Sequence, residues 1–457
     1  MRGINTKENQ KMSFMVTAQS NKNTDWRYRL STIILLLAAF PIQIYAVPGF
    51  EITPSLILAA AVFLLSKPSE KAIYVVIGFL AICGLLALLG MVGNDGRIKN
   101  LIGAASFSSG FPYLLVGLVF ASYSIDIAKL WQPVAVAAVL VTVIFMVDLY
   151  LTNGNLILSA AYDSVAYSAP ETTFINSVFP FYGKYAVITL ATIAMMLAGL
   201  SIAAASSFRG NFKIFVLIVS NLLMFISFTT WTRQVMLGVI LFYAILIVMA
   251  FRRKETWVSF GVFLILLGPW AYFLQADSRS LLSWEANGHV VGAEGIGTHK
   301  FQTSIDYLKD GNFDKLSTGR LPLYRDAFNR ITPRILLGGC GFCNIADVLK
   351  FPFSSLHNVI LTAVFKGGVI YAAIYLCVAF GSLILLWFRK KSFSRDATYA
   401  VVASIAVQSL FNDVLYFQVV PALLFTLSGY LIGSSSIGEK FFLRREVVAP
   451  AFGSGTH

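Results

Sequence analysis

Apolar runs of a length that can cross a lipid bilayer recur along almost the whole chain. A membrane-spanning helix needs about 17–25 predominantly apolar residues. The runs cover residues 30–47, 53–66, 72–92, 101–122, 133–151, 183–206, 213–230, 234–251, 257–275, 358–388, 398–415 and 417–435. Only 12% of the residues are charged, so polar side chains are too few to cover a water-facing surface. The sequence therefore predicts an all-α fold, a polytopic membrane helix bundle with about twelve transmembrane helices.

Lysine and arginine residues gather on one side of this predicted bundle. They are frequent in the N-terminal tail, in alternate short loops and in the C-terminal tail. The short segments on the other side hold only Arg97, Lys99, Lys184 and Arg233. An excess of positive charge marks the cytoplasmic side of a membrane protein. We therefore expect both termini in the cytoplasm. The same bias explains the net charge of +13 better than nucleic-acid binding does, so we expect no nucleic-acid partner.

This orientation divides the chain into five segments. The predicted segments are a cytoplasmic N-terminal tail at 1–29, transmembrane spans one to nine at 30–275, a large outer loop at 276–357, spans ten to twelve at 358–435, and a cytoplasmic C-terminal tail at 436–457. The outer loop is the longest polar stretch of the chain, and any chemistry is expected on its side of the membrane.

The outer loop contains apolar residues at helical spacing. Leu321, Tyr324 and Phe328 fall on one face of a helix, which predicts an amphipathic helix in this part of the loop. Pro333 and the glycine-rich stretch 338–341 are expected to end that helix in a turn.

No pattern in the sequence supports a metal ion or another cofactor. Cys340 and Cys343 form a lone Cys-x-x-Cys pair, and a structural zinc site needs a second pair of ligands. A local disulfide or two free thiols are favoured over a metal or redox site. Cys83 and Cys377 lie in apolar runs and are expected to pack there. The sequence has no P-loop, no dinucleotide fingerprint, no His-Glu-x-x-His and no paired carboxylates.

Two groups of arginines stand at the outer side. Arg233 lies at the outer end of the eighth apolar run, where it either extends to the lipid headgroups or binds an anion in a cavity. Arg320, Arg325, Arg330 and Arg334 follow one another in the outer loop. The planar guanidinium group suits phosphate oxygens. Spacings of five, five and four residues put at most two or three of these four on one helical face, and the others are expected to face solvent or lipid headgroups.

Two further polar positions adjoin the last apolar runs. His357 and Asn358 directly precede the tenth run. Histidine either hydrogen-bonds a headgroup there or acts as a base near neutral pH. Asp413 lies in the turn between the last two runs, where it either caps the following helix or pairs with an arginine of the site.

Four local motifs, taken in this order and on this side of the membrane, resemble those of the O-antigen ligase and polymerase superfamily of bacterial membrane glycosyltransferases. The motifs are Thr-x-x-Thr-Arg-x-x-x-Leu-Gly at 229–238, Thr318-Gly319-Arg320 with Tyr324, the Pro…Gly-x-Gly stretch at 333–341, and His357-Asn358 with Leu361 and Gly368. Each motif is short, and the first 200 residues contribute only their hydropathy pattern to the resemblance.

The resemblance implies a GT-C-like bundle in the bacterial inner membrane, with the active site and the loop 276–357 in the periplasm. It implies transfer of a glycan from undecaprenyl diphosphate to a sugar hydroxyl, without a metal ion or cofactor. It suggests His357, Arg233 and Arg320 as catalytic residues. Further substrate-binding residues would be Arg325, Arg330, Asn358 and Asp413.

The resemblance leaves the acceptor open. In ligases the acceptor is the lipid A core, and in polymerases it is a second lipid-linked repeat unit. The single dominant outer loop tilts the interpretation towards a ligase. A lipid-glycan flippase or another transporter is the competing class, because an even number of spans with both ends inside suits it too. Transporters commonly show two related halves, and this chain has no matching long loop in its first half.

Overall fold

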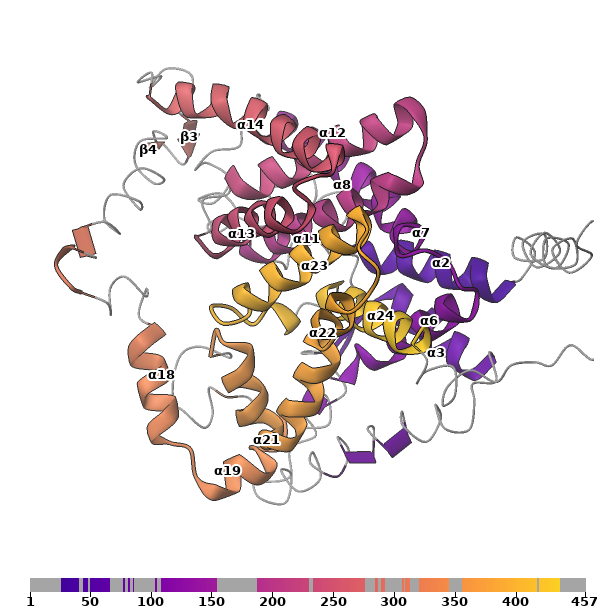
Figure 1. Ribbon diagram of the computed structural model, residues 1–457. Coiled ribbons are helices and arrows are strands. Elements are labelled where there is room, and N and C mark those ends of the chain that lie inside the picture. The colour runs from indigo at the N-terminus through magenta and orange to yellow at the C-terminus, as the bar shows by residue number, and fades with distance from the viewer. Residues whose placement is uncertain are drawn as a thin grey trace, which may run out of the picture.

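The computed structural model describes residues 26–40, 44–47, 50–65, 77–78, 81–82, 85, 103–104, 108–153, 187–229, 233–275, 284–286, 289–291, 306–307, 309–312, 320–343, 345, 356–416 and 419–435. Within this part of the chain the fold is built from helices packed side by side (Figure 1). The predicted all-α class is therefore confirmed.

The main helices follow the order of the apolar runs. They are α2 (Trp26–Ala39), α3 (Pro54–Leu65), α6 (Phe111–Ser122), α7 (Ile127–Leu130), α8 (Gln132–Asn153), α11 (Val187–Ala204), α12 (Gly210–Thr229), α13 (Arg233–Ala250), α14 (Lys254–Gln275), α18 (Arg320–Asn329), α19 (Pro333–Gly338), α21 (Val359–Phe380), α22 (Ser382–Trp387), α23 (Phe393–Gln408) and α24 (Val419–Gly433). Two short 3-10 helices, η1 (Ala205–Ser207) and η3 (Val414–Tyr416), complete the described helical elements.

Two antiparallel strand pairs lie outside the helical core. Strand β1 (Ile44–Val47) pairs with β2 (Phe50–Ile52), with Ile44 opposite Ile52. Strand β3 (Trp284–Ala286) pairs with β4 (His289–Val291), with Trp284 opposite Val291. The first pair corrects the predicted run 30–47, because the helix in that run ends at Ala39.

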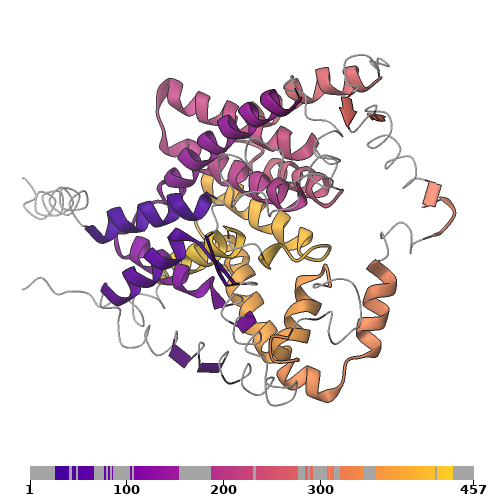
Figure 2. The same cartoon turned by 180° about the vertical axis from the view of Figure 1, so that it is seen from behind.

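The buried core is centred on α11, which packs against α8, α12 and α23. Small residues line this helix, and Ala194, Ala198 and Ala203 are almost completely buried. Small side chains let helix backbones approach closely. Close packing of this kind lets helices associate where the hydrophobic effect does not act between them. Figures 1 and 2 show α18 on the far side of this core from α2.

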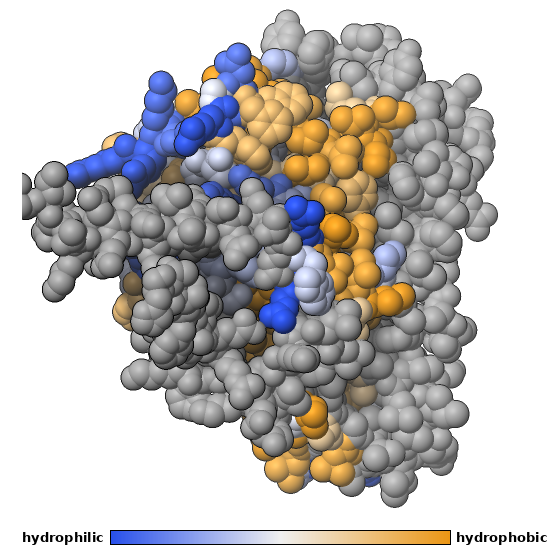
Figure 3. Space-filling model, turned by 90° about the vertical axis from the view of Figure 1, so that its right-hand side faces the viewer, coloured by the Kyte–Doolittle hydropathy of each residue, from blue (hydrophilic) through white to orange (hydrophobic). Residues whose placement is uncertain are grey.

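Two of the described helical stretches, Gly210–Phe228 and Val359–Trp387, are long and apolar enough to cross a membrane by length and composition. Shorter apolar helices accompany them. Large apolar side chains also lie on the outside, where Val248 is 81% exposed and Ile265 is 73% exposed. Figure 3 shows a patch of apolar side chains on one face, with polar side chains along its border. The predicted number of about twelve transmembrane helices stays a prediction.

The outer-loop helix forms, but with a different buried face. Helix α18 buries Leu323 and Ala327, whereas Leu321 is 39% exposed and Phe328 is 60% exposed. The predicted helix is therefore confirmed, but of the residues on its predicted apolar face only Tyr324 is partly buried. The periodicity of the sequence indicates where the apolar residues of a helix lie. Which of them become buried depends on the element that the helix packs against. Here Leu323 and Ala327 pack with buried residues around the start of α21.

Two smaller expectations are also corrected. Pro333 does not end α18 but occupies the first turn of the new helix α19, where its missing amide costs nothing. The side chain of Thr332 caps that helix by accepting a hydrogen bond from the amide of Ile335 at 3.3 Å. Cys377 is exposed on α21 rather than packed, and Cys83 lies outside the described residues.

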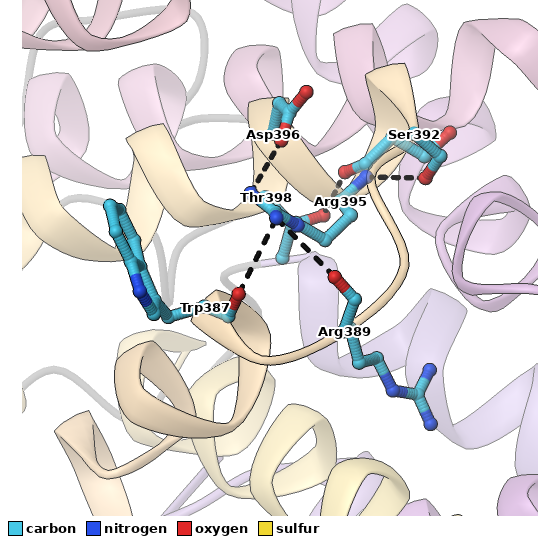
Figure 4. Close-up of polar contacts among 7 residues, drawn as sticks. Trp387, Arg389, Ser392, Arg395, Asp396 and Thr398 are labelled. Atoms are coloured by element: carbon cyan, nitrogen blue, oxygen red, sulfur yellow. Dashed lines mark hydrogen bonds and ion pairs between the residues drawn. The ribbon is translucent and has the colours of Figure 1, made fainter. Parts of the chain in front are cut away.

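Helix α23 starts before the predicted run 398–415 because its first turn buries an ion pair. The Ser392 side chain accepts a hydrogen bond from the amide of Arg395 and begins the helix. Arg395 Nη1 donates to Asp396 at 2.6 Å, and both side chains are 4% exposed (Figure 4). Arg395 Nη2 also donates to the carbonyl groups of Trp387 and Arg389, so this arginine caps the end of α22.

We predict that Arg395→Met lowers the free energy of unfolding by about 3–5 kcal/mol, because the buried Asp396 carboxylate loses its counter-charge. Thermal unfolding of the purified protein in detergent measures this change. Arg395→Met/Asp396→Leu should be more stable than the single variant, and Lys390→Met, at an exposed neighbouring position, should unfold like the parent protein. An unchanged unfolding temperature for Arg395→Met would contradict the capping role.

Candidate functional site

The predicted site residues come from four segments that the chain separates widely. Arg233 and Gln234 begin α13, Arg320 begins α18, and His357 and Asn358 lead into α21. Residues 409–413 follow the end of α23. The contacts among these segments decide which of the predicted residues lie together.

Arg320 joins α18 to α13. Its Nη2 donates a hydrogen bond of 3.4 Å to Oε1 of Gln234, whose side chain is buried. The Nε2 atom of Gln234 is buried without a hydrogen-bond partner in the described part of the chain. Arg233 directly precedes Gln234 at the first position of α13, and its side chain lies outside the described residues. The structure thus places Arg320 in contact with the residue that follows Arg233.

Tyr324 joins α18 to the start of α21, one helical turn after Arg320. Its hydroxyl lies 3.0 Å from the carbonyl oxygen of His357 and 3.3 Å from that of Leu410, and it donates to these two acceptors. Burial raises the pKa of Tyr324, against the lowering effect of the Arg320 charge. The hydroxyl therefore keeps its proton near neutral pH and remains a donor.

Asn358 anchors the start of α21 in two directions. Its Oδ1 accepts a hydrogen bond of 3.0 Å from the amide of Leu361, which makes it the N-cap of the helix. Its Nδ2 donates to the carbonyl oxygen of Leu410 at 3.1 Å. The preceding residue, His357, has a φ of +50°, which few non-glycine residues adopt. The cap and the tyrosine together hold His357 in this conformation, and its imidazole is partly exposed.

Asp413 is buried and contacts α21 close to His357. Both of its carboxylate oxygens accept from the Thr362 hydroxyl, at 2.9 and 3.0 Å. Asp413 directly precedes η3 rather than α24, and its amide donates to Oδ1 of Asn412. The carboxylate therefore binds the first turns of α21, and the segment after α23 is tied to the segment that carries His357.

The other arginines of α18 and α19 lie away from this contact. Arg325 is exposed. Arg330 forms an ion pair of 3.0 Å with Asp326, in which both side chains are partly exposed. Arg334 is exposed on α19. Of the four loop arginines, Arg320 shares the helix face of Tyr324, as the spacing of four residues between them dictates.

Helix α21 is broken at Gly368, and a turn of the outer loop fills the break. Gly368 has φ 81° and ψ 175°, an extended conformation inside the helix. The amides of Cys340 and Phe342 donate to the carbonyl groups of Phe365 and Lys366, at 2.6 and 2.8 Å. Cys340 and Cys343 form a disulfide that closes this buried turn. Of the alternatives left open for the two cysteines, the structure contains the disulfide.

Within the described residues, no group of three or more His, Cys, Asp or Glu side chains comes together as a metal site would require. The arrangement brings the segments that carry Arg320 and His357 together through Tyr324, with the Arg320 guanidinium and a partly exposed His357 as the groups that can act on a ligand. Such a site can bind an anion and accept a proton.

No family model matches the chain, and no curated protein matches it. A family for this protein is therefore a proposal that depends on the motifs and on the geometry described above.

Sequence reasoning missed Gln234, Thr362 and Lys366. Gln234 and Thr362 are ordinary residues whose importance comes from what they contact. Lys366 could have been recognised from the sequence, since it is the only charged residue in the apolar run 358–388. A charge inside an apolar run is costly and therefore points to a partner or a function.

We predict that Gly368→Ala destabilises the protein by about 1–3 kcal/mol, because an extended backbone with positive φ is open essentially to glycine alone. A Cβ atom there would also collide with the carbonyl oxygen of Leu337. Thermal unfolding measures the effect. Gly261→Ala in α14 is the matched control, because its Cβ would meet no atom within 4 Å. Equal unfolding temperatures for the two variants would contradict a requirement for the break.

We also predict that thiol reagents reach Cys340 and Cys343 only after reduction. The denatured protein is treated with maleimide before and after a reducing agent, and peptide mass spectrometry locates the label. Cys377, a free thiol, is the internal control that labels in both samples. Labelled Cys340 in the unreduced sample would show that the turn is not closed by a disulfide.

Proposed function

We propose that this protein is an inner-membrane glycosyltransferase of the O-antigen ligase and polymerase type, which transfers a glycan from undecaprenyl diphosphate to an acceptor hydroxyl in the periplasm. The observation that carries the proposal is the contact of Tyr324 with the His357 carbonyl, together with that of Arg320 with Gln234. These contacts bring three of the four resembling motifs to one place. Helices Gly210–Phe228 and Val359–Trp387, the low charge content and the exposed apolar side chains support the membrane location.

The proposed reaction exchanges one bond of the anomeric carbon for another. The acceptor hydroxyl oxygen attacks that carbon, the bond to the diphosphate oxygen breaks, and the configuration inverts. His357 takes the proton of the hydroxyl or orients it. The electron pair of the broken bond leaves with undecaprenyl diphosphate, whose negative charge therefore increases in the transition state.

Arginine charge stabilises this leaving group in the proposed mechanism. Arg320 and Arg233 clamp the diphosphate, since a planar guanidinium group can bind two phosphate oxygens at once. A fixed donor of this kind contributes about 2.7–4 kcal/mol to the transition state. Arg325 and Arg330 are the further arginines suggested as substrate-binding residues. Arg325 is exposed on α18 and Arg330 directly after it, and a role for them requires a substrate that extends over this surface. Asn358 and Asp413 act by holding the start of α21.

The acceptor separates two versions of this proposal. The ligase version uses the lipid A core, and the polymerase version uses a second lipid-linked repeat unit. The single dominant outer loop 276–357 in the sequence tilts the proposal towards the ligase.

A transporter is the second candidate, and the break in α21 is the observation that favours it. Discontinuous helices with freed backbone groups form the binding sites of many secondary transporters. In this protein the freed carbonyl groups of Phe365 and Lys366 accept hydrogen bonds from the Cys340–Cys343 turn. Because these carbonyl groups already have protein donors, the break supports transport less well than transfer.

The transfer reaction is tested with purified protein in detergent, a synthetic undecaprenyl-diphosphate glycan and excess chelator. Lipid A core and a second lipid-linked repeat unit are offered as acceptors in parallel. We expect product on the core, with a rate about 100–1000-fold lower in Arg320→Ala and no detectable product in His357→Ala. Tyr324→Phe should lower the rate about tenfold through misplacement of His357. Arg334→Ala, at an exposed position of α19, is the matched control and should retain the parent rate.

The outcomes separate the alternatives. A ladder of lengthening lipid-linked glycan would establish the polymerase version. Absence of product with both acceptors, from parent protein shown to be folded by its unfolding transition, would reject the transfer reaction. Movement of the same lipid-linked glycan across vesicles by that protein would then identify a flippase.

A further inference from the structure

Lys366 is a buried charge that the proposed mechanism does not use. It lies on α21 with 6% of its surface exposed, in a run that holds no other charged residue. A cation in such a place costs free energy unless an anion or hydrogen-bond acceptors surround it. We therefore expect an anion or hydrogen-bond acceptors near Lys366 within the bundle.

The carboxylate of Asp413 is an anion that acts on Lys366, and Thr362 links it to the same face of α21. The two groups interact electrostatically, and Asp413 is itself 5% exposed. Thr362 stands one helical turn before Lys366 on the same face of α21 and donates to both oxygens of the same carboxylate. Asn358, the N-cap, stands one turn further towards the start of the helix. Asn358, Thr362 and Lys366 thus form a polar column along α21 that meets the segment after α23.

The backbone at Lys366 is also held in place. Its carbonyl oxygen accepts from the amide of Phe342, within the disulfide-closed turn, and Gly368 breaks the helix directly afterwards. Lys366 therefore ends the first part of α21, where the negative end of the helix dipole favours a cation. This short helical part has His357 at one end and Lys366 at the other.

We propose that Lys366, as the counter-charge of the buried Asp413, is a positioning residue that holds the first part of α21 and thereby sets the place of His357 in the candidate site. The inference deepens the proposed transfer reaction and rests on it for its catalytic consequence. Lys366 touches no reacting atom in this scheme. Its charge keeps the Asp413 carboxylate at Thr362. This contact ties α21 to the segment after α23, in which the carbonyl oxygen of Leu410 accepts from Tyr324 and Asn358.

A double-variant cycle tests the pair. Lys366→Met and Asp413→Asn each leave one buried charge without its partner, and Lys366→Met/Asp413→Asn removes both. We expect each single variant to speed amide hydrogen exchange over residues 356–362 about tenfold or more, and the double variant to exchange more slowly than either single one. Thr362→Val keeps both charges and removes the hydroxyl, so it should speed exchange in the same segment by a smaller factor.

The transfer assay gives the second measurement. We expect kcat of the single variants to fall about 10–100-fold with KM nearly unchanged, because a displaced His357 affects the reaction more than binding. The double variant should recover part of kcat. Lys213 and Glu255 form the matched control pair, joined at 2.7 Å between α12 and α14 with both side chains partly exposed. Lys213→Met should leave kcat and the exchange of residues 356–362 unchanged.

The two readouts distinguish failure of the inference from failure of the proposed function. Unchanged exchange in both single variants, or fully additive effects in the double variant, would overturn the positioning role whatever the transfer assay gives. Lower stability with normal kcat per folded molecule would also overturn it. Coupled exchange in a protein that transfers no glycan would support the role of Lys366 in holding α21 and would reject only the transfer reaction. If Lys366→Met does not fold, the comparison of Asp413→Asn with the double variant carries the same test, because the double variant should still exchange more slowly than Asp413→Asn.

Discussion

A helix that breaks inside an apolar bundle must find new hydrogen-bond donors for the carbonyl groups that it frees, because neither lipid nor apolar side chains can supply them. In α21 the freed carbonyl groups of Phe365 and Lys366 receive the amides of Cys340 and Phe342. This exchange docks the end of the outer loop into the bundle. Helix α19 packs directly on α21 as a result (Figure 1). The position of α18, and with it Arg320 and Tyr324, follows from this docking, since α18 and α19 are separated by three residues at 330–332.

The candidate site is assembled by groups that hold backbone rather than by an extensive network of charged side chains. Tyr324 and Asn358 bind carbonyl groups of His357 and Leu410, and Asp413 binds the hydroxyl of Thr362. Each of these bonds joins segments far apart in the sequence. The partly exposed imidazole of His357 and the guanidinium of Arg320 are thus presented on a rigid frame. A rigid frame favours catalysis of the proposed kind, because it stabilises developing charge without reorganisation during the reaction.

Two buried basic residues, Arg395 and Lys366, each interact with a buried carboxylate. Arg395 and Asp396 pair at the first turn of α23, where the arginine also caps the end of α22. Lys366 and Asp413 interact near the start of α21. Both acidic residues are buried, so removal of either cation weakens the compensation of a buried carboxylate. The first pair joins consecutive helices, whereas the second lies next to the candidate site, and this difference in place gives the two pairs their different proposed roles.

The sequence by itself determined the helical class, the order of the apolar helices and the residues with chemical potential, because hydropathy and side-chain chemistry are local properties. It could not place the ends of α2 and α23, since β1 and the buried Arg395–Asp396 pair depend on partners elsewhere in the chain. It predicted the helix α18 but not which of its side chains are buried. Lys366 was overlooked although that charge was visible in the run 358–388. Only the tertiary structure decided that Arg320 meets Gln234, that Tyr324 holds His357 and that the cysteines close the break in α21. These contacts join residues separated by long stretches of chain, and no local pattern encodes such a distance.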